Sequence, residues 1–411
     1  MKTLKYFCLL VLAGVCIAAC NLEVIPDDDG GGGNPLPDGT FAKKFGTSNV
    51  VDKGYSIIET TDKKIVVTGE ARGAGSGGSD IVLIKLDDKG VEQYTKYFGG
   101  PLDDVGYEVR ELSTKNYKIT GRYTEADYER LYSFQTLTDG IISGSPLKMN
   151  IQSEGRGALE LSGRFSYFGT ENLCDQSSVC NHFWMFQTDL FGNVVGINDG
   201  YGSGVNTLGA AAVVSSNSAG NIYGVGKQYN DNTNQYDPYL IRMPNNFVTI
   251  PNMLTKDFKE AGNQTLNALV ELVDNTFVAV GETENNAKGT SDILFIRFDA
   301  DLNLVGSPVK IGGSGTDRAN AIIRTSDDKL VIVGETSSEG AGDLDVYLLK
   351  VDFSGTIIWE ETIGGTFKDG GYDVAEASNG DLLITGYTQN TANASDVDLY
   401  VIRASSKGKV Q

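Results

Sequence analysis

Acidic side chains recur at one position of a phrase that repeats along the chain, directly before a stretch of alternating apolar residues. Carboxylates in such a slot can hold a cation such as Ca²⁺ through their oxygens, or they can cap a turn by accepting backbone N–H groups. We favour capping, because a residue that recurs in every unit serves the unit itself more often than a ligand. The acids of this slot, which are also candidate binding residues, are Asp52, Asp104, Glu154, Asp317 and Asp369.

A second acid opens a later apolar stretch of the same phrase, and a basic residue follows five places on. We expect both to serve turn hydrogen bonds and ion pairs between neighbouring units, which contribute little singly when exposed. The acids are Asp80, Asp237, Asp292, Asp345 and Asp398, and the bases are Lys85, Arg242, Arg297, Lys350 and Arg403.

Two cysteines, Cys174 and Cys180, lie close together in "ENLCDQSSVCNHF". In an exported protein the expected state of such a pair is a local disulfide. The alternative is a metal site completed by His182, the single histidine of the chain, but this segment offers at most three ligands. We therefore predict the disulfide and no metal site.

The sequence contains few signs of catalysis. It has no His-Glu-x-x-His, no Gly-x-Ser-x-Gly and no phosphate-binding loop. "GAGSGG" at residues 73–78 matches a dinucleotide-binding string but opens no helix, so that interpretation fails. Tyr229 and Tyr236 flank the polar segment "NDNTNQ" and suit stacking and hydrogen bonding with a sugar, and they equally suit an ordinary polar loop.

The N-terminus predicts export and a lipid anchor. Residues 1–19 have a basic start and a short apolar run, which is typical of a signal peptide. The run ends in "IAAC", which resembles the lipobox of bacterial lipoproteins and implies lipidation of Cys20. Residues 20–39 are rich in glycine, proline and aspartate and predict a flexible tether. Its acidic run 27–29 resembles the export cue of surface lipoproteins of Bacteroidetes, and the alternative is that it only solubilises the linker.

The formal net charge of −20 argues against nucleic acid or a bare anionic membrane as a partner. It fits a soluble body held off a membrane by the lipid on Cys20. We expect a bacterial outer-membrane lipoprotein, exposed at the cell surface and monomeric.

The repeat itself predicts the architecture. One of its strands ends on a glycine seven times, at spacings of 48 to 57 residues, and each unit contains four short alternating stretches separated by turn residues. A four-stranded sheet cannot bury both faces alone, so the units must pack on each other. Residues 40–411 therefore predict an all-β, seven-bladed β-propeller of four-stranded antiparallel blades, in which the five slot acids would ring one mouth of the channel.

The order of the stretches predicts how the ring closes. The repeat region begins with a stretch of the outermost type, "TFAKKFG", and ends with one of the third type, "VDLYVIR". We expect the first strand, in residues 40–46, to complete the last blade and to leave no open seam.

The phrase "GG", an acid, an alternating strand, "DG" or "NG", then "VTGxT", is similar to the bacterial seven-bladed propeller repeat of the SBBP type, as found in Bacteroidetes-like lipoproteins. The resemblance covers residues 40–408, is strongest in blades 1, 2, 6 and 7, and implies a fold without one activity. The long loops that follow the second strand and the outer strand of each blade, such as "ARGAGSGGS" and "QYNDNTNQY", differ from blade to blade and should lie on one side of the ring, the variable loop face. The sequence favours a non-enzymatic module that presents this face to a protein or glycan. The alternative is a propeller enzyme that acts on extracellular glycans through two carboxylates in the channel mouth.

Overall fold

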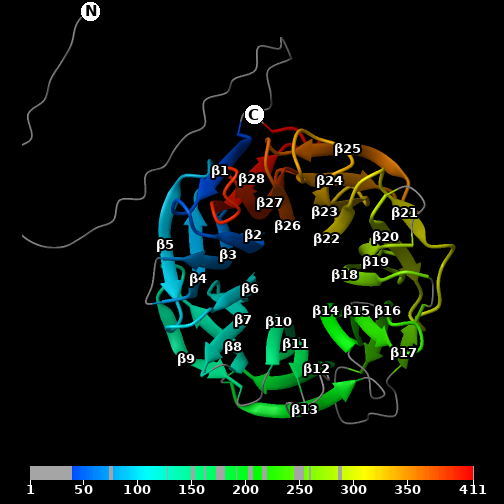
Figure 1. Cartoon of the computed structure of the whole chain (residues 1–411). Coiled ribbons are helices and arrows are strands. Elements are labelled where there is room, and N and C mark those ends of the chain that lie inside the picture. The colour runs from blue at the N-terminus through cyan, green and yellow to red at the C-terminus, as the bar shows by residue number, and fades with distance from the viewer. Residues whose placement is uncertain are drawn as a thin grey trace, which may run out of the picture.

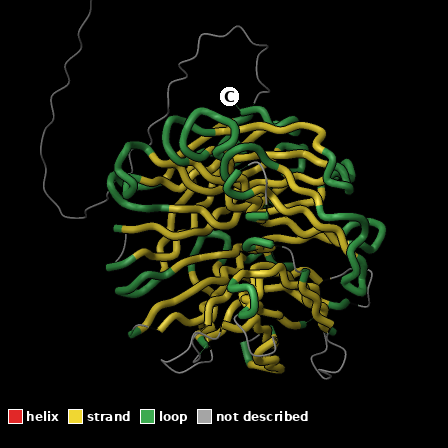
Figure 2. Tube along the Cα trace, turned by 45° about the vertical axis from the view of Figure 1, so that its right-hand side comes forward, coloured by secondary structure: helices red, strands yellow, loops and turns green. Residues whose placement is uncertain are grey.

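The chain folds into seven four-stranded antiparallel sheets arranged in a ring, as a computed structural model shows (Figure 1). The structure describes residues 39–73, 77–126, 128–149, 153–161, 163–172, 181–190, 192–201, 207–214, 220–244, 254–258, 261–285 and 289–410. Within these ranges there is no helix, and therefore none long and apolar enough to cross a membrane (Figure 2). The predicted seven-bladed β-propeller is confirmed.

Each blade runs from an inner strand at the central channel to an outer strand at the rim (Figure 1). The inner strands are β2 (Lys53–Glu59), β6 (Val105–Glu111), β10 (Ser153–Leu161), β14 (Thr207–Val214), β18 (Gln264–Glu271), β22 (Asp317–Arg324) and β26 (Asp369–Glu376). The second strands are β3 (Ile65–Arg72), β7 (Tyr117–Glu125), β11 (Arg164–Asn172), β15 (Ile222–Asn230), β19 (Phe277–Thr283), β23 (Leu330–Thr336) and β27 (Leu382–Gln389).

The third strands are β4 (Ser79–Leu86), β8 (Tyr128–Thr136), β12 (Asn181–Asp189), β16 (Gln235–Met243), β20 (Asp292–Phe298), β24 (Asp345–Val351) and β28 (Val397–Ala404). The outer strands are β5 (Glu92–Phe98), β9 (Ile142–Lys148), β13 (Val194–Tyr201), β17 (Leu254–Asp257), β21 (Val309–Ile311), β25 (Ile357–Ile363) and β1 (Phe41–Phe45).

The pattern of buried and exposed residues in each strand follows the place of that strand in the blade. Second and third strands are buried on both faces, so β4 reads "SDIVLIKL" with every residue buried. Outer strands are partly or fully exposed on both faces, and β5 reads "EQYTKYF" accordingly. β-Branched and aromatic residues dominate the buried strands because they pack well on a pleated surface.

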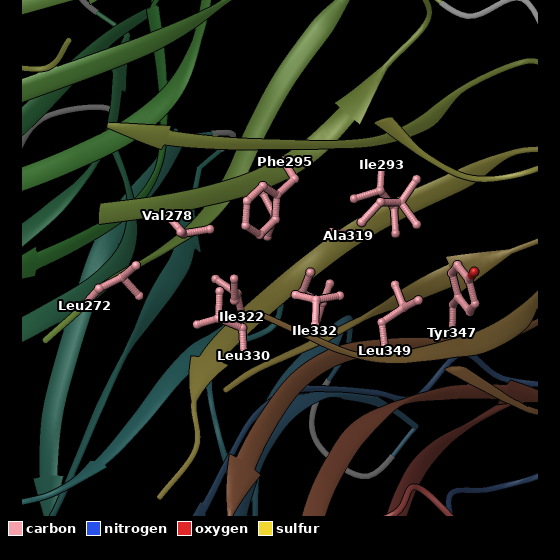
Figure 3. Packing of buried hydrophobic residues seen from close by; sticks show 13 residues of the cluster. Leu272, Val278, Ile293, Phe295, Ala319, Ile322, Leu330, Ile332, Tyr347 and Leu349 are labelled. Atoms are coloured by element: carbon pink, nitrogen blue, oxygen red, sulfur yellow. The ribbon is translucent and has the colours of Figure 1, made fainter. Parts of the chain in front are cut away.

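The hydrophobic core lies between neighbouring blades. One cluster joins blade 5 (β18–β21) to blade 6 (β22–β25), and Figure 3 shows Phe295 and Val278 facing Ile322 and Ile332 across this seam. Equivalent clusters join blades 6 and 7 and blades 7 and 1. Because each blade buries its two faces only against its neighbours, the ring must be complete to be stable.

The ring closes between the two ends of the chain. β1 pairs antiparallel with β28, so that Phe41 lies opposite Arg403 and Lys44 opposite Tyr400. The last sheet therefore has the order β1-β28-β27-β26, as the chain order predicted (Figure 1). Phe41, Phe45 and Ala42 add to the hydrophobic clusters on both sides of this blade.

A β-bulge interrupts every inner strand at the same place. In β2 the register shifts between Gly54 and Ser56, and the other six inner strands shift at the equivalent position. The bulge brings a main-chain carbonyl onto the repeated glycine of the second strand: a Cβ on Gly69 would lie 1.8 Å from the carbonyl oxygen of Lys53. This close approach explains why that position is always glycine.

Candidate functional site

The acids of the first slot lie in the turns that lead into the inner strands. Asp104 is fully buried and accepts hydrogen bonds from the backbone N–H groups of Gly100 (2.6 Å) and Thr124 (2.7 Å). Asp52, which is 2% exposed, accepts from Thr47 (3.1 Å) and Arg72 (2.7 Å) in the same way. These are the hydrogen bonds that capping predicts, and each acid ties its own turn to the end of the second strand.

The remaining acids of the slot follow this arrangement where their side chains are described. Asp317 and Asp369 are buried and accept from the N–H groups of Gly313 (2.8 Å) and Gly365 (2.7 Å). Glu154 lies in β10 opposite Thr170, and its side chain is outside the described part. The structure therefore places four of the acids in buried turns, away from the residues that line the central cavity.

At four seams the slot acid of one blade meets the third-strand acid of the preceding blade. A Cβ on Gly364 would lie 2.0 Å from Asp345 Oδ1 and 2.7 Å from Asp369 Oδ2. The two oxygens thus converge on one glycine, and the same geometry recurs at Gly46, Gly99 and Gly312. Burial, followed by the charge of the neighbouring acid, raises the pKa of Asp52 to about 6, and burial also raises the pKa of Asp104 and Asp369.

The bases of the third strands form ion pairs, but the prediction that these pairs join neighbouring blades is wrong for four of the five, which pair with an acid of their own blade. Lys350 Nζ lies 2.7 Å from Asp327 in the inner turn of its own blade. Arg242 reaches the next blade instead, with Nη1 2.6 Å from Asp301. These contacts hold turns together and leave no base of this set at the cavity.

The central channel contains a cavity of about 500 Å³ that all seven blades line. Each blade contributes the bulged residue of its inner strand, which the register shift leaves without an opposing residue in the second strand. These seven residues are Tyr55, Tyr107, Arg156, Ala210, Asn267, Asn320 and Tyr372. Bulges often re-aim a side chain in this way near functional sites.

One arc of the cavity is aromatic. Tyr372, Tyr55 and Tyr107 come from blades 7, 1 and 2, which are neighbours in the ring. The rings of Tyr55 and Tyr372 stack with centroids 5.2 Å apart, and Tyr107 is tilted against Tyr55 at 5.5 Å. Burial raises the pKa of Tyr55 and Tyr372, and the nearby Glu70 and Glu335 add to it. The phenols therefore stay neutral, and the Tyr55 hydroxyl donates to Glu70 Oε1 at 2.8 Å.

The opposite arc is polar and carries most of the charge. Arg156, Lys227 and Arg318 line it together with one carboxylate, Glu282, among the described residues. Arg318 Nε lies 3.5 Å from Glu282 and 3.6 Å from Glu335, so its charge is compensated. The cations of this arc therefore lie among carboxylates of the same wall, Glu282 and Glu335.

The amides of this arc also join the blades. Asn267 Nδ2 donates to the carbonyl oxygen of Ala319 at 2.9 Å, and Asn320 Nδ2 donates to that of Gly371 at 2.8 Å. The cavity wall is thus fixed by contacts from one inner strand to the next. A rigid wall lowers the entropic cost of holding a ligand.

The other predicted residues have different outcomes. Tyr229 and Tyr236 pack edge to face with centroids 5.2 Å apart, and Lys227 Nζ lies 4.6 Å from the Tyr236 ring centroid, so this pair adjoins the cavity. Cys20, Cys174 and Cys180 lie outside the described residues. The described part of the chain contains no group of three or more His, Cys, Asp or Glu side chains placed to hold a metal ion.

Sequence reasoning missed the bulged residues, although three of them left a signal. Gly54-Tyr55, Gly106-Tyr107 and Gly371-Tyr372 repeat one dipeptide at the same place of three adjacent blades. Alternation alone assigns these tyrosines to one face of a regular strand, and only the extra residue of the bulge aims them at the channel. Arg156 and Ala210 lie in blades whose repeat has diverged and carry no such signal.

Comparison with known proteins supports the fold and assigns no family. No family model matches the chain, and no curated protein matches it. Polysaccharide lyase Uly1 is similar in structure, with a TM-score of 0.56 at 11% identity over 86% of this chain and 90% of that chain. A catalytically inactive virginiamycin B lyase from Staphylococcus aureus with quinupristin has a TM-score of 0.52 at 12% identity, over 88% of this chain and 99% of that one. Drosophila plexin A in complex with semaphorin 1b gives 0.51 at 10% identity, over 90% of this chain and 87% of that one.

These likenesses, all at low identity, show a β-propeller and nothing finer. Propellers of this kind serve both as enzymes and as binding modules, so the function has to be argued from the site.

Proposed function

We propose that the protein is a non-catalytic β-propeller that binds a glycan in its central cavity. The observation that carries this proposal is the convergence of seven bulged residues, one per blade, on a single cavity of about 500 Å³. That volume lies within the range of small-molecule sites in proteins. All seven blades thus direct the side chain of a bulged residue into the same cavity.

The lining suits a sugar better than a purely apolar ligand. A pyranose has apolar C–H faces and polar hydroxyl edges, and aromatic rings with a polar tip match both. Tyr55, Tyr107 and Tyr372 supply such rings on one arc, and the amides Asn267 and Asn320 lie on the other. Only a small number of placed polar groups is needed to fix the orientation of a ligand in such a site.

The rival function, a glycan hydrolase with two carboxylates, has less support. Such an enzyme needs two carboxyl groups facing each other across the scissile bond. Among the described residues the cavity is lined by one, Glu282, and that group is engaged by Arg318. The four slot acids whose side chains are described accept hydrogen bonds in buried turns.

The setting that we propose is the bacterial cell surface. Lipidation of Cys20 and the tether of residues 20–39 would hold the ring away from the membrane, in keeping with the resemblance to SBBP-type propeller lipoproteins. A protein partner on the variable loop face remains a further prediction. Mass spectrometry of the exported protein, with Cys20→Ala as the comparison, tests the anchor.

The glycan proposal is tested with the chain from residue 21 onward, which keeps the whole ring. Binding to an array of oligosaccharides identifies ligands, and titration calorimetry then compares Tyr372→Ala with Tyr97→Ala, a partly exposed tyrosine on the outer strand β5. We expect Tyr372→Ala to weaken binding about tenfold or more, as for loss of an aromatic contact worth about 1.4 kcal/mol. Equal affinities for the two variants and the natural chain, or no glycan bound at all, would refute the proposal.

A further inference from the structure

Blade 4 carries an aromatic pair beside the central cavity that the repeat does not require. Tyr229 in β15 lies directly opposite Tyr236 in β16, one residue pair before the loop that joins these two strands. In the other six blades, whose second and third strands the structure also describes, the equivalent second-last pair never consists of two aromatic residues. A feature confined to one blade is not needed to build a blade.

The aromatic pair is continuous with the lining of the cavity. Lys227, which lines the cavity, lies two residues before Tyr229 in β15, so both side chains are on the same face of the sheet. Lys227 Nζ is 4.6 Å from the centroid of the Tyr236 ring, and the centroids of Tyr236 and Tyr229 are 5.2 Å apart. Because β15 runs toward the variable loop face, the three side chains form a row from the cavity to that face.

This row offers ring surface and hydrogen bonds rather than a free charge. Glu282 attracts the Lys227 ammonium, so that charge is engaged within the protein. Both tyrosines are half-buried, and the Tyr229 hydroxyl donates to Asn234 Oδ1 at 3.3 Å in an exposed position. A half-buried tyrosine presents an apolar ring with a polar tip, and this combination matches the C–H face and the hydroxyl edge of a sugar.

Hydrogen bonds hold the backbone around the aromatic pair. The Tyr236 N–H donates to Asn263 Oδ1 at 3.0 Å, and Asn263 Nδ2 donates to Glu284 at 2.8 Å in the next blade. Asn230 Nδ2 donates to Asp237 at 2.8 Å across the base of the loop. The two rings therefore sit on a preorganised support, which lowers the entropic cost of binding.

We propose that the glycan is an oligosaccharide that runs from the central cavity to the variable loop face, and that Tyr229 and Tyr236 form a second sugar subsite where it leaves the cavity. This inference rests on the proposed glycan function. Blade 4 lies across the ring from blades 7 and 1, which carry Tyr372 and Tyr55 (Figure 1). One sugar contacts one of these two aromatic surfaces, whereas a chain of several sugars reaches both.

The alternative is that the aromatic pair only stabilises the hairpin of β15 and β16. Cross-strand aromatic pairs do contribute to the stability of a sheet. Such a role predicts a loss of stability when a ring is removed, and it predicts no change in the preference among ligands of different length. The test therefore compares a short ligand with a long one.

The probes are the disaccharide and the hexasaccharide of the cello-, xylo- and N-acetylchito-oligosaccharide series. Titration calorimetry measures their binding to the chain from residue 21. We expect at least one series to bind, and its hexasaccharide to bind about tenfold more tightly than its disaccharide, since an additional aromatic contact contributes an effect of that size.

Substitutions in the two aromatic surfaces separate the subsites. Tyr236→Ala should remove most of the preference for the hexasaccharide and change binding of the disaccharide by less than about twofold, whereas Tyr236→Phe should keep the preference because the ring makes the contact. Tyr372→Ala should weaken both lengths. The matched control is Tyr128→Ala, an exposed tyrosine at the start of β8 on the same face of the ring, and it should behave as the natural chain.

The outcomes distinguish this inference from the proposed function. If the natural chain binds both lengths equally, or if Tyr236→Ala keeps the preference, there is no second subsite, and glycan binding in the cavity stands. If Tyr236→Ala weakens both lengths equally, the pair acts through the fold and this inference fails. If no probe binds the natural chain, this inference also fails, and the wider oligosaccharide array decides the proposed function. A length preference that depends on Tyr236, together with loss of both lengths in Tyr372→Ala, supports both.

Discussion

Replacing Asp52 by asparagine should flatten the dependence of folding stability on pH between pH 4 and pH 7. Asp52 is 2% exposed, and its carboxylate meets Asp398 at the seam where the ring closes: a Cβ on Gly46 would lie 2.7 Å from Asp52 Oδ2 and 2.2 Å from Asp398 Oδ1. Burial, opposed by the hydrogen bonds from Arg72 and Thr47 and increased by the charge of Asp398, raises its pKa from 3.8 to about 6.

The raised pKa of Asp52 fixes the sign of the change of folding stability with pH. A carboxyl group with a raised pKa keeps its proton longer in the folded state than in the unfolded state. The contribution of Asp52 to stability is therefore fully present below pH 3.8 and is lost as the pH rises through about 6. The difference between these two pKa values corresponds to roughly 3 kcal/mol at 1.36 kcal/mol per pH unit.

The Asp52→Asn variant changes this dependence of stability on pH. Asparagine keeps one acceptor oxygen and loses the other, so one of the two backbone N–H groups is left unsatisfied at a cost of about 1–3 kcal/mol at every pH. At pH 4 the variant should be the less stable protein. At pH 7 this loss should be offset by the absence of the buried charge, so that the two proteins have similar stability.

The assay is urea unfolding of the chain from residue 21 at half-unit steps from pH 4 to pH 7. The matched control is Asp88→Asn, an exposed acid in blade 1. If Asp52→Asn and the control show the same slope as the natural chain, the charge at the seam is compensated and the argument fails. A slope of the opposite sign in the natural chain would also contradict it.

Three further predictions concern the same seams and the loop of blade 3. Gly364→Ala should destabilise the ring by about 1–3 kcal/mol, because the new Cβ clashes with the carboxylates of Asp345 and Asp369. Gly365→Ala is the control and should be tolerated, because a Cβ there meets nothing within 4 Å. Denaturant unfolding compares the two variants, and equal effects would show that the seam can relax. Cys174 and Cys180 should form a disulfide worth about 2–3 kcal/mol, so intact mass should rise by two hydrogens on reduction, and two free thiols in the untreated protein would disprove it. Calcium should raise the melting temperature no more than sodium at matched ionic strength, because the four slot acids with described side chains accept hydrogen bonds from backbone donors; a calcium-specific rise of several degrees would restore the cation interpretation.

The sequence allowed the ring and its closure to be predicted because both depend on the phase of the repeat. Glycine at the end of each second strand marks the register of every blade, and the isolated outer strand at residues 40–46 can only pair beside the last third strand.

The burial of the slot acids was harder to predict. The acids of the first slot could be found by spacing, but spacing cannot tell whether a carboxylate faces a channel or accepts two N–H groups in a turn.

The cavity could not be predicted for a related reason. A bulge adds one residue to a strand, and the alternation of the sequence continues on both sides without a visible break. The repeated Gly-Tyr of Tyr55, Tyr107 and Tyr372 indicates a bulge only when the glycine of the facing strand is considered with it. Arg156 and Lys227 lie in the neighbouring blades 3 and 4, where the repeat has diverged, so spacing alone did not place them at the cavity.

The most direct test of the account is a crystal structure of the chain from residue 21 with the tightest-binding oligosaccharide. The account predicts electron density in the central cavity, with a sugar ring against Tyr55 or Tyr372 and its hydroxyl groups within hydrogen-bond distance of the side chains of Asn267 or Asn320. A ligand bound to the loop face, with the cavity occupied only by water, would contradict it.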